Sequence, residues 1–348
     1  MAPSPFWRAD RHRDRRERLI ARSRIAAAIR AHFDGQGFVE TACSSLVVSP
    51  GNEAHLHAVR AEVRDASGQP HSLYLHTSPE FAMKELLAAG ETKIYELARV
   101  FRGRESGPLN APEFTMLEWY RAGAPYETVI TDAIDIIRLA AQIAGVNTLR
   151  SRGRAADISV APQRVTVAEA FARYADIDLL ATVEPRGAGR RDALAADARK
   201  AGISVRESDS WSDVFSRVLQ ERIEPNLREG IIILDEYPRP EAALARASPR
   251  DPRVAERFEI YVAGVEIANG FGELNDAEEQ RRRFTAEMDE KERIYKERYP
   301  LDEDFLAALA HMPPASGVAL GFDRLVMLAT DARDINDVLW TPAPPLGQ

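Results

Sequence analysis

The sequence predicts an α+β fold in which helices flank an antiparallel β-sheet, and three observations support this prediction. Strand-like patterns occur in neighbouring pairs, within residues 57–76, 94–121 and 256–274. Helix-like patterns stand between these pairs instead of following each single strand, as they would in a doubly wound parallel sheet. The chain has 348 residues, enough to bury one large core, and we expect a single domain over residues 1–348.

Periodicity and helix-ending residues place each element of the first 144 residues. The predicted elements are, in order, a helix at 15–34, short strands near 57–63 and 72–76, a helix within 77–90, strands at 94–102 and 113–121, and a helix at 126–144. The first helix depends on apolar residues at i+4 spacing and ends at the glycines of "DGQGF". In "TSPEFAMKELLAAG", Ser78 is placed to cap the helix, Pro79 to occupy its first turn and Gly90 to end it.

The second half begins with a segment of different composition. Residues 145–250 contain arginine- and alanine-rich helical pieces and loops such as "VEPRGAGRRD", so we interpret them as an insertion packed on the main domain. Strands return at 256–274, and a charged helix follows at 276–298. The closing segment "GVALGFDRLVML" predicts a glycine-rich strand that continues into a helix.

Composition excludes several classes of protein. No run of about 18 apolar residues occurs, so we expect no membrane span. The N-terminus lacks the apolar core of a signal peptide, so we expect a cytoplasmic protein. The single cysteine, Cys43, excludes a disulfide framework and a thiolate metal cluster, and a net charge of −8 does not suggest a nucleic-acid-binding protein. Residues 1–30 carry nine arginines, which form either a solvated helix face or a docking surface for an acidic or RNA-bound partner.

The hairpin predicted at 94–121 can gather charged and aromatic side chains on one face. Strand side chains alternate, so Phe114, Glu118 and Tyr120 share a face. If the two strands pair, Arg102 can join them, and its planar guanidinium suits phosphate oxygens. Phe114 could then cover a base, while Glu118 and Tyr120 could hold an ammonium group. The alternative is a partly exposed hairpin with one salt bridge.

A second group of carboxylates follows in "FEIYVAGVEIANGFGELND". Gly264 permits a tight turn, so Glu259 and Glu266 could meet across a hairpin as oxygen ligands for Mg²⁺. Three further residues have common parity and would face one site: Asn269, Phe271 and Glu273. Carboxylates on a strand face are usually solvated, so each one alone is weak support. Together with an arginine, and without a cysteine or histidine cluster, they suggest a magnesium–nucleotide site with an amine substrate.

The third group lies in "SGVALGFDRLVML". Gly317 and Gly321 let the backbone approach a ligand closely. Arg324 falls in the first turn of the following helix, where it could bind phosphate or simply pair with Asp323 on the helix surface.

Together these segments resemble class II aminoacyl-tRNA synthetases, and within them the lysyl enzymes. "FR…APEFTMLEWY" is similar to motif 2, "GVALGFDRL" is similar to motif 3, and "TSPEFAMKELL" and "EIANGFGELND" are similar to the lysine-pocket segments. The resemblance covers nearly all of residues 15–340. It implies a motif 1 region at 15–50, a motif 2 hairpin at 94–121, an insertion at 145–250, and a sheet with motif 3 at 256–330.

The resemblance also implies a particular branch of the family. Motif 1 begins near residue 15, which leaves no space for the anticodon-binding barrel of a lysyl-tRNA synthetase. The chain therefore resembles the truncated lysyl-synthetase paralogues that modify translation elongation factor P, the elongation factor P–lysine ligases. Ala319, where lysyl synthetases usually have glycine, accompanies the use of (R)-β-lysine in that branch. The implied enzyme is an ATP-dependent, adenylate-forming ligase that uses Mg²⁺, forms a homodimer through motif 1, and does not act on tRNA.

The family's functional residues carry over position by position. Arg102 and Arg324 would be catalytic, holding the α- and γ-phosphates, and Phe114 would stack on adenine. The full ATP-binding set is Arg102, Gly103, Arg104, Glu105, Asn110, Ala111, Phe114, Glu266, Ile267, Gly321 and Arg324. The amino-acid substrate would contact Ser78, Pro79, Glu80, Glu118, Tyr120, Asn269, Phe271, Glu273 and Ala319. Glu259 and Glu266 would hold Mg²⁺.

The sequence departs from the family in the loop after Arg102. Family members commonly have Arg-Asn-Glu where this chain has Arg102-Gly103-Arg104, so the usual ATP-facing acid is missing. Glu105 could replace it only if the loop bends, because adjacent strand residues point to opposite sides. A histidine usual in this loop is Asn110, and the motif 1 proline is replaced by Ala42.

Two other functions remain open at this point. One is a tRNA-charging enzyme, and the other is a non-catalytic binding module built on the synthetase fold. The sequence does not decide between α-lysine and (R)-β-lysine, and it does not identify a base for the transfer step.

Overall fold

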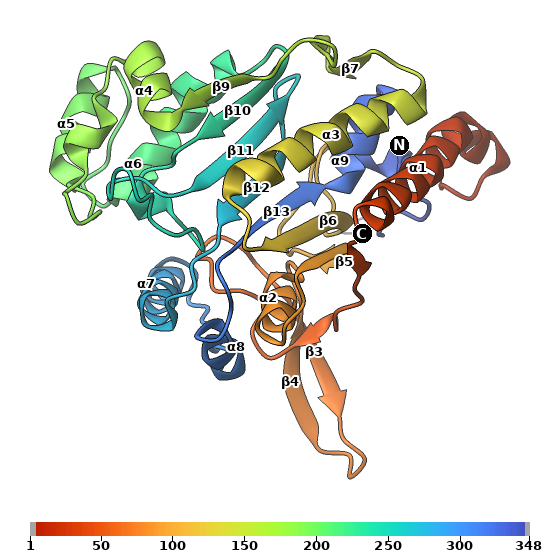
Figure 1. The fold of residues 1–348 in the computed structure, drawn as a ribbon, viewed down its shortest axis with the longest axis horizontal. Coiled ribbons are helices and arrows are strands. Elements are labelled where there is room, and N and C mark those ends of the chain that lie inside the picture. Colours follow the sequence, from red (N-terminus) through yellow and green to blue (C-terminus); the bar gives the residue numbers. More distant parts are fainter. Residues whose placement is uncertain (1–4, 345–348) are drawn as a thin grey trace.

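A mixed eight-stranded sheet forms the centre of the protein (Figure 1). The computed structural model describes residues 5–344. Within that range the α-helices are α1 (Ala9–Gly35), α2 (Glu80–Ala88), α3 (Tyr126–Ala144), α4 (Val167–Ala175), α5 (Arg191–Lys200), α6 (Trp211–Val218), α7 (Ala277–Tyr295), α8 (Glu303–Leu309) and α9 (Phe322–Thr330). The strands of the central sheet, in spatial order, are β1 (Val39–Glu40), β5 (Lys93–Phe101), β6 (Glu113–Ala122), β13 (Ala315–Gly321), β12 (Val265–Gly272), β11 (Arg257–Val262), β10 (Ile231–Asp235) and β9 (Gln163–Thr166).

The strand directions confirm the predicted α+β class. The six strands from β5 to β10 pair antiparallel with one another. Parallel pairing occurs only at the two edges of this sheet, between β1 and β5 and between β9 and β10. Helices therefore cover an antiparallel sheet instead of alternating with parallel strands.

The two faces of the sheet have different roles because side chains alternate along each strand. On β6, Leu117 and Trp119 are fully buried in the main hydrophobic core, together with Phe33 of α1 and Ile137 of α3. Figure 1 shows α1, α3 and α9 on this side of the sheet. The alternate residues of β6 point to the opposite face, toward the side of α2, α7 and α8.

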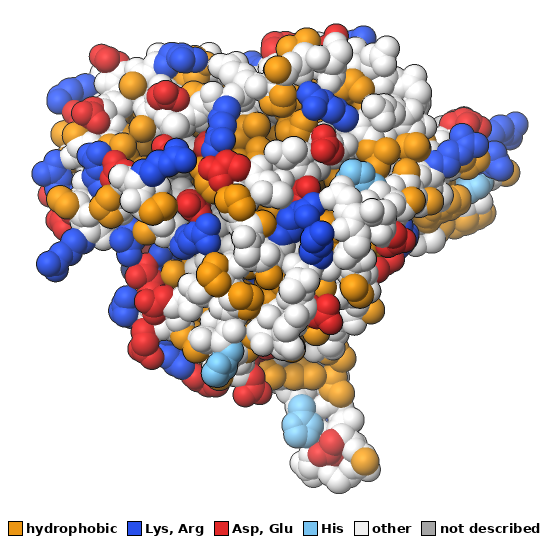
Figure 2. All heavy atoms as spheres, viewed as in Figure 1, with side chains coloured by type: hydrophobic (Ala, Val, Ile, Leu, Met, Phe, Trp, Pro, Cys, Tyr) orange, Lys and Arg blue, Asp and Glu red, His pale blue; other side chains and the backbone are white. Residues whose placement is uncertain are grey.

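The first helix begins earlier than predicted and uses some of its arginines internally. It starts at Ala9, six residues before the predicted boundary. Arg15 is buried and donates a hydrogen bond to the carbonyl of Leu339, and Arg22 forms a buried ion pair with Asp323 of α9. Other basic side chains of α1 lie on the surface among acidic ones, at the right of Figure 2.

The segment 145–250 builds its own hydrophobic cluster but also extends the central sheet. Phe171 of α4 stacks on Phe215 of α6 with ring centroids 5.1 Å apart. Strands β9 and β10 come from this segment and pair with each other, and β10 pairs with β11. Our prediction of helical pieces missed these strands and the small hairpin of β7 (Thr148–Ser151) and β8 (Arg154–Asp157). The insertion is thus continuous with the main sheet.

A hairpin projects from the body of the molecule (Figure 1). It consists of β3 (Val59–Arg64) and β4 (Pro70–Leu75), and the short β2 (Leu46–Val47) pairs with β4. In the range 5–344, no helix has the length and apolar character needed to cross a membrane.

Candidate active site

The strand register brings the predicted site residues onto one face of the sheet. Glu118 on β6 lies opposite Ala319 on β13, which in turn lies opposite Asn269 on β12. Two residues further along these strands, Tyr120 of β6 and Phe271 of β12 both lie opposite Gly317 of β13. The hairpin of β5 and β6 pairs as the sequence predicted. Glu118, Ala319 and Asn269, which were all predicted to contact the amino-acid substrate, therefore form a row across the neighbouring strands β6, β13 and β12.

A cavity of about 270 Å³ opens over this face. Most of the predicted residues line it: Ser78, Glu80, Arg102, Glu105, Asn110, Ala111, Phe114, Glu266, Ile267, Asn269, Phe271, Ala319, Gly321 and Arg324. The lining also contains residues that sequence reasoning missed, among them Glu53, Leu56, Leu244 and Asp323.

One end of the site is a buried acidic pocket built around Glu118. The Glu118 carboxylate is fully buried and accepts hydrogen bonds from Ser78 Oγ at 2.5 Å and from the Tyr120 hydroxyl at 3.0 Å. Burial and the nearby charge of Glu80 raise the pKa of Glu118 to about 8. The predicted helix cap at Ser78 is wrong, because Pro79 is the N-cap and Ser78 uses its hydroxyl for Glu118 and the Glu80 N–H.

A buried lysine that sequence reasoning missed links two acids of this pocket. The Lys84 ammonium lies 2.6 Å from a carboxylate oxygen of Glu80 and 2.6 Å from one of Glu273. Burial alone would lower the pKa of Lys84, but the two adjacent carboxylates outweigh burial and raise it. The sequence did contain a signal for this ion pair: Lys84 follows Glu80 by four residues in a predicted helix, a spacing at which the two side chains can meet.

Two acceptor atoms of this pocket have no hydrogen-bond donor. Asn269 Oδ1 and Glu273 Oε1 are buried and unpartnered in the described part of the chain. Burial raises the pKa of Glu273 to about 7, although Lys84 acts against this rise. Buried acceptors are normally paired in native proteins. Acceptors without donors, beside carboxylates that outnumber the one lysine, are chemically suited to a cationic ligand.

Two arginines also line the cavity. Arg102 donates from Nε to the carbonyl of Thr77 at 3.2 Å, and its guanidinium lies 5.4 Å from the centre of the Phe114 ring. Arg324, in the first turn of α9, donates from Nη1 to the backbone carbonyl of Glu266 at 2.8 Å. Each arginine thus has most of its five N–H donors available for phosphate oxygens.

A β-bulge places Glu266 on the same face as Asn269. Residue parity alone would put these two side chains on opposite faces of β12. The pairing shifts between Ile260 and Tyr261, so that Tyr261 lies opposite Glu266 while Ile260 lies opposite Ala268. A bulge inserts one extra residue and redirects the side chains that follow. Both Glu266 and Asn269 therefore line the cavity.

The loop after Arg102 bends in the way that the missing acid requires. Arg104 adopts a left-handed conformation with φ of 61°, and its side chain turns away to Glu297 at 2.7 Å. Glu105 consequently lines the cavity, where Asn110 donates a hydrogen bond to it. Gly103 does not line the cavity and pairs with the loop at His57. The structure thus brings Glu105 to the cavity and leaves Gly103 and Arg104 outside it.

Glu259 and Glu266, which were predicted to hold Mg²⁺, could bind a cation only if both contribute ligands. Glu259 accepts hydrogen bonds from Arg257 at 2.7 Å and from Tyr261 at 2.9 Å, and its remaining lone pairs are free for a ligand. Glu266 is exposed, and it lies opposite Tyr261, two residues along the strand from Glu259. Among residues 5–344 no group of three or more histidine, cysteine or acidic side chains is arranged to hold a metal. A cation here would need further ligands from phosphate oxygens.

Comparison with known proteins places the chain in a family. The family profile "tRNA synthetases class II (D, K and N)" matches residues 5–344. The elongation factor P–(R)-β-lysine ligase of Haemophilus ducreyi is 39% identical over 92% of each chain, and that of Edwardsiella ictaluri is 36% identical over 92% of this chain and 93% of its own. The lysine–tRNA ligase of Moorella thermoacetica is 36% identical over 93% of this chain and 64% of its own. The chain belongs to the class II tRNA synthetase family, as its sheet and its site residues indicated.

Proposed function

We propose that the protein is an ATP-dependent ligase that adenylates (R)-β-lysine, or lysine, and transfers it to a lysine side chain of translation elongation factor P. The observation that carries this proposal is an acidic cluster beside a cavity that two arginines also line: Glu80 and Glu273 pair with Lys84, and Glu118 is joined to the cluster through Ser78. Excess buried carboxylate suits a substrate with two ammonium groups. The similarity over 92% of the elongation factor P ligase of Haemophilus ducreyi supports the same assignment.

The site geometry suits adenylate formation. The substrate carboxylate is already ionised, so it can attack the α-phosphorus of ATP without a general base. Catalysis then depends on alignment and on neutralising the negative charge that develops on the phosphate oxygens. Arg102 and Arg324 provide that charge, and Phe114 provides an aromatic surface for adenine. Glu118, Tyr120 and Asn269 would hold the amine groups at the far end of the substrate.

Mg²⁺ would be held by Glu259 and Glu266 together with the phosphates of ATP. Two carboxylates plus phosphate oxygens are a common donor set for this ion, which rarely has an all-protein cage. When bound, the ion would neutralise charge on the departing pyrophosphate. Glu105 and Asn110 would contribute from the loop as nucleotide contacts.

Other expectations from the sequence stay predictions. These are a homodimer formed through the motif 1 region, a cytoplasmic location, and the absence of activity on tRNA. The match to lysine–tRNA ligases such as that of Moorella thermoacetica makes tRNA charging the second candidate function.

Two assays test the proposal in order. Pyrophosphate exchange with ATP and Mg²⁺ is measured with α-lysine and with (R)-β-lysine, and we expect exchange that favours (R)-β-lysine. The protein is then incubated with ATP, Mg²⁺, (R)-β-lysine and elongation factor P, and the mass of the factor should rise by one β-lysyl group. An unchanged mass despite adenylate formation would contradict the transfer assignment. Charging of tRNA under the same conditions would support the second candidate.

A further inference from the structure

Arg22 of α1 is the centre of a buried polar network that joins three parts of the protein. Its guanidinium donates from Nη1 to Asp323 Oδ1 on α9, and from Nη2 to the hydroxyl of Thr115 on β6 at 2.8 Å. The backbone N–H of Thr115 donates to the other carboxylate oxygen of Asp323 at 2.7 Å. Arg22 and Asp323 are buried, and no buried side-chain nitrogen or oxygen of either lacks a partner within residues 5–344. The network is therefore closed and fully hydrogen-bonded.

The Asp323 carboxylate continues the hydrogen bonding between β13 and β6 past the last paired residues. The register of these two strands ends at Gly321 and Met116. Beyond that pair, the N–H of Thr115 donates to the side chain of Asp323. The first turn of α9 is thereby attached to β6 at a defined position, and Arg22 holds both partners from the side of α1.

Both ends of this network adjoin residues that we propose to bind ATP. Asp323 directly precedes Arg324, and Thr115 directly follows Phe114. Phe114, Asp323 and Arg324 all line the cavity, whereas Arg22 does not. Adjacent strand residues point to opposite faces of a sheet, so Thr115 faces Arg22 while Phe114 faces the cavity. A side chain outside the cavity thus fixes the position of Phe114 relative to Arg324.

Arg22 also balances a negative charge in the wall of the nucleotide site. Within residues 5–344, Arg22 is the only cationic side chain that forms an ion pair with Asp323. Arg324 donates instead to the backbone carbonyls of Glu266 and Leu109. Without Arg22, a buried and unbalanced carboxylate would lie beside the phosphates of ATP. Such a charge repels an anionic ligand strongly, because water screens it poorly.

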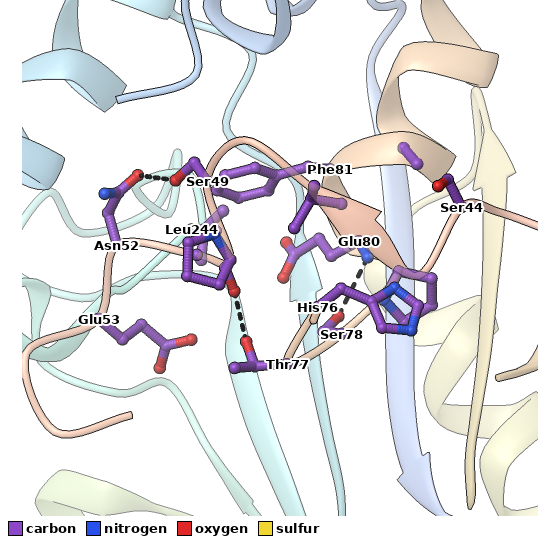
Figure 3. Close-up of a pocket in the computed structure, with 15 residues that line it drawn as sticks. Ser44, Ser49, Asn52, Glu53, His76, Thr77, Ser78, Glu80, Phe81 and Leu244 are labelled. Atoms are coloured by element: carbon purple, nitrogen blue, oxygen red, sulfur yellow. Dashed lines mark hydrogen bonds between the residues drawn. The ribbon is translucent and has the colours of Figure 1, made fainter. Parts of the chain in front are cut away.

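The amino-acid part of the cavity is fixed by contacts of a different kind. Figure 3 shows Thr77, Ser78 and Glu80 in the turn before α2 and at its start. Thr77 Oγ1 donates to the carbonyl of Pro50 at 2.6 Å, and the N–H of Glu80 donates to Ser78 Oγ at 3.0 Å. These hydrogen bonds join neighbouring loops and do not involve α1. Loss of Arg22 should therefore disturb the nucleotide contacts and leave the amino-acid contacts in place.

We propose that Arg22 is a positioning residue for ATP. Through Thr115 and Asp323 it holds Phe114 and Arg324 in place, and it neutralises the carboxylate in the cavity wall. This inference rests on the proposed function, in which Phe114 and Arg324 bind ATP. The role requires a planar guanidinium, because two of its nitrogens bond to two different elements at once, which a single ammonium group matches poorly.

Direct measurement of ATP binding tests this role. Isothermal titration calorimetry with ATP and Mg²⁺, without an amino acid, reports the Kd and the fraction of binding-competent protein separately. Arg22→Met should raise the Kd for ATP by about 3-fold to 30-fold, the range for residues that act on a site without touching its ligand. Arg22→Lys should recover part of the lost affinity. Arg24→Met, at an exposed position of the same helix, is the matched control and should leave the Kd unchanged.

A double variant tests the charge argument. Arg22→Met/Asp323→Asn removes both charges, and the amide oxygen of the asparagine can still accept from the Thr115 N–H. Its Kd for ATP should return to within about threefold of the unchanged protein. In pyrophosphate exchange, the KM for ATP of Arg22→Met should rise with the Kd. The KM of that variant for (R)-β-lysine should change by less than about twofold.

The outcomes separate a positioning role from a structural one. If Arg22 only stabilises the fold, Arg22→Met will contain less binding-competent protein but will bind ATP with an unchanged Kd, and that result would overturn the proposal. A double variant that binds ATP no better than Arg22→Met would overturn it as well. If the unchanged protein binds no ATP, the proposed function fails instead.

Discussion

Replacement of Lys84 by methionine tests whether the acidic pocket depends on one buried cation. Methionine keeps the length and apolar stem of lysine, so the change removes charge with little change in volume. The variant leaves Glu80 and Glu273 without the ammonium that lies 2.6 Å from each. Removal of one partner from a buried ion pair typically destabilises a protein by about 3–5 kcal/mol. Protonation of Glu273 limits this destabilisation, because the pKa of that carboxyl is already raised to about 7.

The expected destabilisation therefore depends on pH. A carboxyl with a raised folded-state pKa stabilises the fold below its unfolded pKa and loses that contribution as pH rises through the folded value. Without Lys84 the folded pKa of Glu273 rises further, so the penalty of Lys84→Met should grow with pH. We expect about 3–4 kcal/mol near pH 8 and about half of that near pH 5.5.

Thermal unfolding followed by circular dichroism at both pH values measures this effect. At about 2–3 °C per kcal/mol for a chain of this size, Tm should fall by roughly 6–12 °C near pH 8. Lys93→Met, at an exposed position of β5, is the control and should change Tm by less than about 2 °C. The double variant Lys84→Met/Glu273→Gln should recover part of the loss, because it removes one unpaired charge. If Lys84→Met unfolds at the same temperature as the unchanged protein near pH 8, the ion-pair argument is wrong.

Two further predictions concern the substrate end of the site. The KM for (R)-β-lysine in pyrophosphate exchange should fall as pH rises from about 6 to 8.5, because the pKa of Glu118 is about 8 and only its ionised form attracts an ammonium group. A KM that is constant or rises over this range would contradict that assignment. Gly317→Ala should abolish activation of (R)-β-lysine, since a Cβ there would lie 2.3 Å from the Tyr120 ring and 2.7 Å from Glu273 Oε1. Gly35→Ala, where a Cβ meets no atom within 4 Å, is its control, and equal activity of the two variants would refute the packing argument.

Sequence reasoning predicted the elements that have strong local signals. The helix at 126–144 matches α3, and the paired strands of the hairpin match β5 and β6 within one residue. Boundaries that depend on tertiary contacts were less accurate. The start of α1 was missed by six residues, and the burial of Arg15 and Arg22 was not predicted, because their partners lie more than 300 positions away. The edge strand β9 and its neighbour β10 were missed because short apolar runs fit buried helices and buried strands equally well.

The alternation of side chains along a strand predicted which residues of regular strands face the site. It could not predict residues whose direction depends on irregular backbone geometry. The register placed Glu118, Ala319 and Asn269 in one row, as alternation requires. The bulge that turns Glu266 to this face, and the left-handed residue that turns Glu105 to it, leave no periodic signal in the sequence.

The loop after Arg102, where the sequence departs from the family pattern, has an unusual backbone conformation in the structure. Arg104 occupies the position at which the resemblance led us to expect an ATP-facing acid. Its left-handed backbone instead sends the side chain to Glu297, which also lies 3.0 Å from His57 Nδ1. The same bend presents Glu105 to the cavity, with Asn110 attached to it. One left-handed residue thus directs the Arg104 side chain away from the cavity and the Glu105 side chain toward it.

The charge balance of the pocket gives a physical reason for substrate selection. Burial, with repulsion from Glu80, holds Glu118 and Glu273 at raised pKa values, so the free site binds protons that an ammonium ligand must displace. A ligand with one cationic group can neutralise only part of this excess and leaves a buried acceptor such as Asn269 Oδ1 unpaired. A substrate with two ammonium groups satisfies both ends at once. Discrimination against neutral amino acids therefore follows from the cost of leaving these acceptors without donors, which is the strongest form of selection available to a small site.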